Sequence, residues 1–89
     1  MASRKLTLTN KRGLHARAAT RLVQCCQAYN ASVTVSNGAQ SADAANVMSL
    51  LMLAAPCGTE LTLEADGKDG DAVLDALEQL FHARFDEEA

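Results

Sequence analysis

The spacing of apolar residues switches between two periods along this chain, and that switch constrains the fold more than any other feature. In residues 5–9 apolar and polar side chains alternate, which predicts a strand with one buried face. From residue 16 the apolar positions recur at helical spacing, which predicts a helix that ends near residues 29–30. The polar residues 10–13 form a turn between them. A chain with both periods must combine strands with helices.

The alternating pattern returns later in the chain. Residues 31–36 and 59–65 each predict a strand with one apolar face. Between them, Asn37–Gly38 predicts a hairpin, because both residues tolerate the positive φ of a type I′ turn. Residues 40–43 then form a short return strand with little to bury, which we expect at an edge of the sheet.

Helical spacing also returns. Asn46 is the predicted N-cap of a second helix that runs to about residue 53. Residues 56–58, with the sequence Pro-Cys-Gly, break the chain before the last strand. Residues 71–84 form the third predicted helix, and residues 86–88 are an acidic tail that we expect to fray.

The predicted order of elements is β-α-β-β-α-β-α, in a single domain over residues 1–89. Because each strand has one polar face, we expect an α+β fold: a two-layer open-faced sandwich whose four-stranded antiparallel sheet is covered on one side by three helices. The predicted buried faces contribute Leu6, Leu8, Ala19, Leu22, Val23, Cys26, Val33, Val35, Ala42, Leu50, Leu53, Leu61, Leu63, Val73, Leu77, Leu80 and Phe81.

Charge and composition exclude several classes of partner. The net charge is −3 and only three residues are aromatic, so neither the basic surface nor the stacking platforms of a nucleic-acid binder are expected. No apolar run is long enough to span a membrane, and the charged N-terminus lacks the apolar stretch of a signal peptide. We therefore expect a cytoplasmic monomer.

The three cysteines do not suggest a disulfide framework. Cys25 and Cys26 are adjacent and Cys57 lies far away, which indicates a reducing compartment. His15 and His82 have no partners at metal-ligand spacing, so we predict no metal site, and no cofactor is called for.

The stretch Gly13-Leu14-His15-Ala16-Arg17 is the candidate functional site. His15 stands where the first helix must begin, so the unpaired backbone N–H groups of Ala16, Arg17 and Ala18 would form an anion site. The Arg17 guanidinium could add to it, and imidazole is a nucleophile with a pKa near neutrality. The alternative is an ordinary surface histidine beside a turn.

Those five residues resemble the active-site signature of the HPr family, the histidine-containing phosphocarriers of the phosphoenolpyruvate phosphotransferase system. The resemblance spans the whole chain, including the element order and the closing helix. It implies that an enzyme I type protein phosphorylates His15 on Nδ1, with phosphoenolpyruvate as the ultimate donor. It also implies that Arg17 assists and that a IIA-type protein accepts the group.

Within the family, the chain most resembles the nitrogen-related branch. The shared stretches are residues 9–11, residues 50–53 and residues 85–87. Two departures from the family pattern stand out. Ala18 replaces a usual proline, which leaves the first turn more flexible with one more N–H donor. Asn46 stands where some carbohydrate-branch members carry a regulatory serine, so serine-kinase control is not expected.

Ser49, one turn further along the second helix, is a remote substitute for that serine. We interpret it instead as a helix-surface hydroxyl.

The second helix carries more apolar residues than one buried face needs. Leu50 and Leu53 can face the sheet, which leaves Val47, Met48 and Leu51 as an exposed surplus. Such a patch is typical of a docking surface, and methionine suits one that must fit several partners. The predicted docking surface is therefore these three residues and Arg21. The alternative is a helix that is buried on more sides.

Three functional hypotheses remain open. The first is a phosphocarrier in a nitrogen-related regulatory phosphotransferase chain, and the second is an HPr of carbohydrate transport. The third is a binding module, switched by His15 phosphorylation, that acts on an enzyme or kinase. An independent enzyme is not predicted, because no second acid, base or metal completes a catalytic site.

Overall fold

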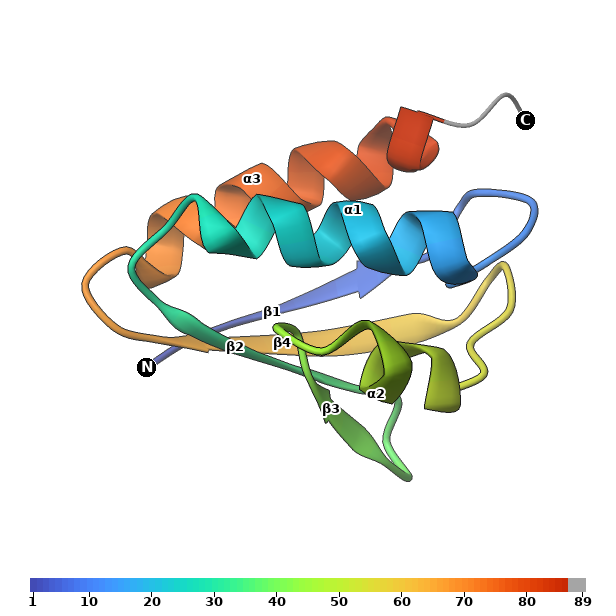
Figure 1. The fold of residues 1–89 in the computed structure, drawn as a ribbon, viewed down its shortest axis with the longest axis horizontal. Helices are drawn as coiled ribbons and strands as arrows, with labels where there is room; N and C mark the ends of the chain where they lie inside the picture. The colour runs from blue at the N-terminus through green and yellow to red at the C-terminus, as the bar shows by residue number, and fades with distance from the viewer. Residues whose placement is uncertain (87–89) are drawn as a thin grey trace.

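The alternating segments form one antiparallel sheet in the computed structural model, which describes residues 1–86 (Figure 1). The spatial order of the strands is β1-β4-β2-β3, so β4 lies inside the sheet and pairs with β1 and β2. The strands are β1 (Ala2–Thr7), β2 (Ser32–Ser36), β3 (Ser41–Asp43) and β4 (Glu60–Asp66).

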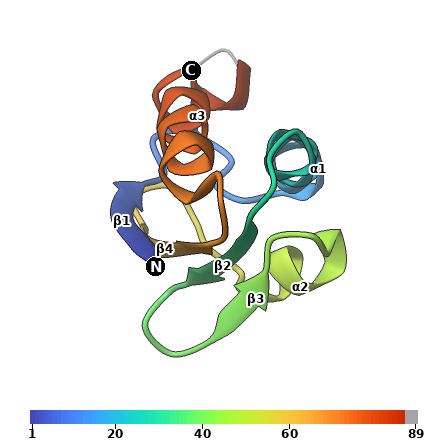
Figure 2. The ribbon, with the colours of Figure 1, turned by 90° about the vertical axis from the view of Figure 1, so that its left-hand side faces the viewer.

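Three helices cover one face of this sheet. Figure 2 shows α1 and α3 side by side above the strands, with α2 next to β3 and α1. The helices are α1 (Ala16–Gln27), α2 (Val47–Met52) and α3 (Gly70–His82). This arrangement and the order β-α-β-β-α-β-α confirm the predicted fold class.

The core lies between the sheet and the helices. Leu61 and Leu63 of β4 and Val35 of β2 are fully buried on the covered face. On the open face, cross-strand neighbours such as Glu64 and Thr34 are exposed, because strand side chains alternate between faces. The apolar faces predicted from the sequence are therefore the faces that the fold buries.

The first strand begins and ends earlier than predicted. It spans Ala2–Thr7 rather than residues 5–9, because its first residues pair with the end of β4. Leu8 is buried as predicted but lies beyond the strand, where its N–H donates to Thr59 O at 2.9 Å and its carbonyl accepts from Gly58 N–H at 2.8 Å.

The predicted type I′ turn at Asn37–Gly38 is wrong. Four residues connect β2 to β3, and within residues 1–86 the non-glycine residues with positive φ do not include Asn37. The Asn37 side chain holds the loop instead: its Oδ1 accepts from the N–H groups of Ala39 and Gln40 at 3.0 and 2.8 Å. The edge position of the return strand is confirmed.

The third helix ends at His82, two residues before the predicted end. Arg84, Phe85 and Asp86 form a left-handed turn with φ of 54°, 54° and 63°. This turn folds the Phe85 ring back onto Phe81, with the ring centroids 5.0 Å apart.

Two details near this end also differ from the prediction. Leu74 is fully buried, while Leu80, which we expected in the core, is only half-buried. Asp86 does not fray, because its carboxylate pairs with Arg21 at 2.9 Å. The other two residues of the predicted acidic tail, 87 and 88, lie outside the described part of the chain.

Candidate functional site

The site begins at a turn that requires glycine. Gly13 has φ of 68°, and a Cβ on it would lie 2.8 Å from Pro56 Cα. The next residue, Leu14, is buried, and its N–H donates to Ala55 O at 2.9 Å. The segment before α1 is therefore pressed against residues 55–56, which fixes where the helix starts.

The sequence analysis placed Asn10 in this turn but missed that it is buried. Its side chain is fully buried, and its Nδ2 donates to Gly13 O at 2.6 Å. The Gly13 carbonyl also accepts from His15 N–H at 3.0 Å. The polar run of residues 10–13 indicates a turn in the sequence, but nothing in that run marks Asn10 as its buried polar member.

His15 is the N-cap of α1, as predicted. Its backbone is extended (φ −90°, ψ −178°), and its carbonyl accepts the first helical hydrogen bond, from Ala19 N–H, at 2.8 Å. Its Nδ1 accepts from Arg17 N–H at 3.3 Å. An accepting Nδ1 carries a lone pair, so the proton of the neutral ring is on Nε2. The half-buried ring is therefore oriented by the helix it caps, with Nδ1 facing the first turn.

The other predicted residues of this stretch lie in the first turn of α1. The side chains of Ala16 and Arg17 are exposed, whereas Ala18 is fully buried and its methyl group packs in the core. The backbone N–H groups of these three residues come before the first N–H that the helical ladder uses, at Ala19. The positive end of the helix dipole thus faces the ring of His15.

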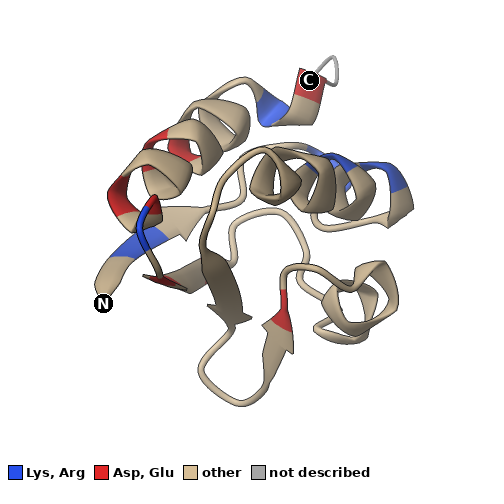
Figure 3. Ribbon diagram, turned by 60° about the vertical axis from the view of Figure 1, so that its left-hand side comes forward, with Lys and Arg blue, Asp and Glu red and all other residues tan. Residues whose placement is uncertain are grey.

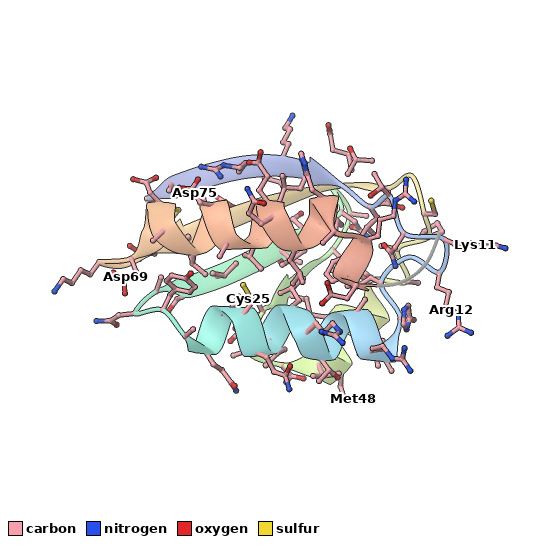
Figure 4. All side chains as sticks on the ribbon, turned by 90° about the horizontal axis from the view of Figure 1, so that it is seen from above. Lys11, Arg12, Cys25, Met48, Asp69 and Asp75 are labelled. Carbon is pink, nitrogen blue, oxygen red and sulfur yellow. The ribbon has the colours of Figure 1, made fainter. Side chains whose placement is uncertain are left out.

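Positive charge gathers at this end of the molecule. In Figure 4, Lys11 and Arg12 project outward from the turn before α1, whereas Asp69 and Asp75 lie at the opposite end. Arg21, one turn beyond Arg17, is half-buried, and its guanidinium pairs with Asp86 at 2.9 Å. Arg21 is thus tied to the C-terminal turn, which the sequence did not indicate.

The apolar patch on α2 differs in part from the prediction. Leu50 and Leu53 are buried and Met48 is 66% exposed, as expected. Val47 and Leu51 are not simply exposed, because both are half-buried against the core. Met52, which the sequence analysis left out, is 75% exposed and lies one turn after Met48. We define the α2 patch as Val47, Met48, Leu51 and Met52.

Two further findings describe residues 1–86. No group of three or more His, Cys, Asp or Glu side chains is placed to hold a metal ion there. In that same stretch, no helix combines the length and apolar character that a membrane crossing requires.

The chain is similar to known proteins in both sequence and fold. Residues 2–83 match the family described as the PTS HPr component phosphorylation site. The phosphocarrier protein NPr of Shewanella violacea is 46% identical over 84 residues, which cover 94% of this chain and 92% of that relative. The phosphocarrier protein HPr of Xylella fastidiosa is 39% identical and covers 99% of each chain. The crystal structure of HPr-C-His from Thermoanaerobacter tengcongensis matches with a TM-score of 0.94 at 29% identity, over 100% of both chains.

Proposed function

Because the chain belongs to the PTS-HPr family of phosphocarriers, we propose that His15 carries the phosphoryl group. In this proposal an enzyme I type protein delivers the group, with phosphoenolpyruvate as the ultimate donor, and a IIA-type protein removes it. The observation that carries the assignment is the hydrogen bond from Arg17 N–H to His15 Nδ1. It directs one ring nitrogen and its lone pair toward the start of α1.

The transfer forms a bond between Nδ1 and phosphorus and breaks the bond between phosphorus and the donor. Once Nδ1 has spent its lone pair, Arg17 N–H can donate to a phosphoryl oxygen instead. The N–H groups of Ala16 and Ala18 and the Arg17 guanidinium can do the same, each hydrogen bond assisted by charge. These donors stabilise the charge without enclosing it, so the group stays accessible to an acceptor.

The α2 patch and Arg21 form the proposed docking surface. Met48 and Met52 present flexible apolar side chains beside α1, a composition that fits more than one partner. The ion pair with Asp86 uses only Nη1 of Arg21, so the guanidinium can offer its other N–H groups to an acidic group of a partner. We propose a cytoplasmic monomer that needs no cofactor and binds proteins rather than nucleic acid.

The finer proposal is a role in the nitrogen-related regulatory phosphotransferase chain. It is supported by the NPr relative, which is more similar to this chain than the HPr of Xylella fastidiosa. The matched test is to incubate the chain with phosphoenolpyruvate and an enzyme I from each branch, and then to add the corresponding IIA protein. Faster labelling by the carbohydrate-branch enzyme, or label that never passes to a IIA protein, would contradict the finer role.

The central test compares two histidine variants. His15→Ala should abolish labelling, whereas His82→Ala, which removes an exposed histidine at the end of α3, should leave it unchanged. The label should be lost in acid and retained in base, as expected for a phosphorus–nitrogen bond. Labelling that survives in His15→Ala, or acid-stable label on Ser49, would overturn the assignment.

A further inference from the structure

A hollow of about 520 Å³ opens between β1 and the C-terminal end of α3. Leu6 and Phe81 contribute to its floor, and both are buried. A volume of this size is typical of a small-molecule site. The polar groups around the hollow come from Lys5, Thr7, Thr9, Glu78, His82 and Arg84.

The charges around the hollow favour an anion, although the whole chain is acidic. Lys5 comes from β1 and Arg84 from the turn after α3, so two cations lie on different walls. The carboxylate of Glu78 accepts a hydrogen bond from the Arg4 guanidinium at 3.0 Å, but the same Arg4 nitrogen also pairs with Asp75 at 2.7 Å, so Arg4 offsets the charge of Glu78 only in part. The lining therefore holds two separated cations, one partly offset carboxylate and one histidine, which leaves an excess of positive charge.

Arg84 is held in place by its backbone rather than by its own side-chain contacts. It starts the left-handed turn of residues 84–86, a conformation that L-residues avoid unless their surroundings impose it. Phe85 anchors the turn by its burial against Phe81, and Asp86 anchors it through its ion pair with Arg21. The turn therefore fixes where the Arg84 side chain starts, whereas the exposed guanidinium becomes ordered when it pairs with a ligand.

The strand side of the hollow adds neutral donors. β1 is an edge strand, and within residues 1–86 no other strand pairs with its outer edge. Thr7 brings a hydroxyl group to the same wall, whereas the Thr9 hydroxyl donates to Phe81 O at 3.3 Å. A bound anion can thus meet N–H and O–H donors as well as the two cations.

We propose that this hollow binds a small organic polyanion with two or three carboxylates, one against Arg84 and another against Lys5. Two cations on separate walls match two separated negative groups better than a single compact one. The hollow is also distinct from the proposed phosphoryl site at His15, so the inference does not depend on phosphotransfer.

The test is a titration of the full, ¹⁵N-labelled chain with citrate at constant ionic strength, followed by amide NMR. We expect saturable shifts at Thr7, Thr9 and His82. Arg84→Gln and Lys5→Gln should each weaken citrate binding about tenfold, since each removes a charged partner. Lys68→Gln, which removes one positive charge from the exposed loop before α3, should leave the affinity unchanged.

Several outcomes would overturn the proposal. Shifts confined to residues 16–18 would mean that citrate binds at the start of α1. If Lys68→Gln weakens citrate binding as much as Arg84→Gln does, the affinity depends on net charge alone. Inorganic phosphate serves as the second ligand, and equal affinity for it would show that one anionic group is sufficient. In each variant, the amide signals of residues outside the hollow report whether the fold is intact. Lys5→Gln changes β1 and Arg84→Gln changes the turn after α3, so the two variants test separate elements.

Discussion

At Gly13 a single residue decides whether the site loop can lie where it does. Both the φ of 68° and the closeness of Pro56 exclude a side chain there. We expect Gly13→Ala to lower the free energy of unfolding by roughly 2–3 kcal/mol, since backbone strain and a steric clash add. Denaturant unfolding of the purified variant measures this loss.

Gly38→Ala is the matched control. Gly38 also has a positive φ, of 96°, but a Cβ there would have no atom within 4 Å. It should therefore cost only the conformational strain, roughly 1–2 kcal/mol. If the two variants are equally destabilised, the contact between residue 13 and residues 55–56 does not constrain the loop.

At this scale the sequence predicted the position of His15 but not the burial of Asn10 or the ion pair of Arg21. A histidine that follows a glycine and precedes helical spacing must lie at a helix start, so its N-cap role could be inferred. The burial of Asn10 could not be predicted, because polar residues around it hide the fact that it is buried. The pairing of Arg21 with Asp86 could not be predicted either, because Asp86 lies in a turn 65 residues further along the chain.

At the scale of elements, α2 offers the sharpest test of the docking surface. Met48→Lys and Met52→Lys should change the free energy of unfolding by only about 0.5 kcal/mol, because both side chains are mostly exposed. Leu51→Lys should cost more, since Leu51 is half-buried. All three should weaken binding to enzyme I, because an unpaired charge would be buried in the complex.

A thermal melt beside a binding titration separates the two effects. Ala72→Lys adds the same charge to an exposed position on α3, away from α2, and should leave binding unchanged. Unchanged binding in Met48→Lys and Met52→Lys would mean that partners dock elsewhere. A large drop in melting temperature in either one would mean that its side chain is part of the core.

The existence and type of the four strands and of α1, α2 and α3 could be predicted from periodicity together with turn and cap signals, but the turn at residues 84–86 and several boundaries could not. The start of β1 depends on pairing of Ala2 with Ala65 of β4, which lies 63 residues further along the chain. The end of α3 depends on burial of Phe85, which stabilises a left-handed turn that no local sequence signal predicts. The loop at Asn37 depends on its side chain, which also donates to Leu53 O at 3.2 Å. Each error has a tertiary contact as its cause.

At the scale of the whole molecule, charge is distributed unevenly. Figure 3 shows basic segments at one end of α1 and acidic segments over the first part of α3. Four of the eight Lys and Arg residues of the chain lie within residues 11–21. This separation of charge gives the protein an electric dipole, which orients the proposed site toward an acidic partner during encounter.

The stability of the whole fold should also fall at alkaline pH, because of a buried thiol. Burial, together with smaller Coulombic contributions from Cys25 and Asp43, raises the pKa of Cys26 from its ordinary value of 9.0 to about 12. In the unfolded chain this thiol loses its proton near pH 9, whereas in the folded chain it stays protonated. Above pH 9 the unfolded state therefore binds fewer protons, so the free energy of unfolding falls as pH rises toward 12.

We expect this loss to reach on the order of 1–2 kcal/mol by about pH 10.5, measured by denaturant unfolding under a reductant. Cys26→Ala should be less stable at neutral pH, because it empties a little core volume, but its stability should fall less steeply above pH 9. Cys57→Ala removes an exposed thiol and should keep the wild-type slope. Burial also raises the pKa of Cys25, so some slope should remain in Cys26→Ala. A slope in Cys26→Ala identical to that of the wild type would show that this thiol does not couple the core to pH.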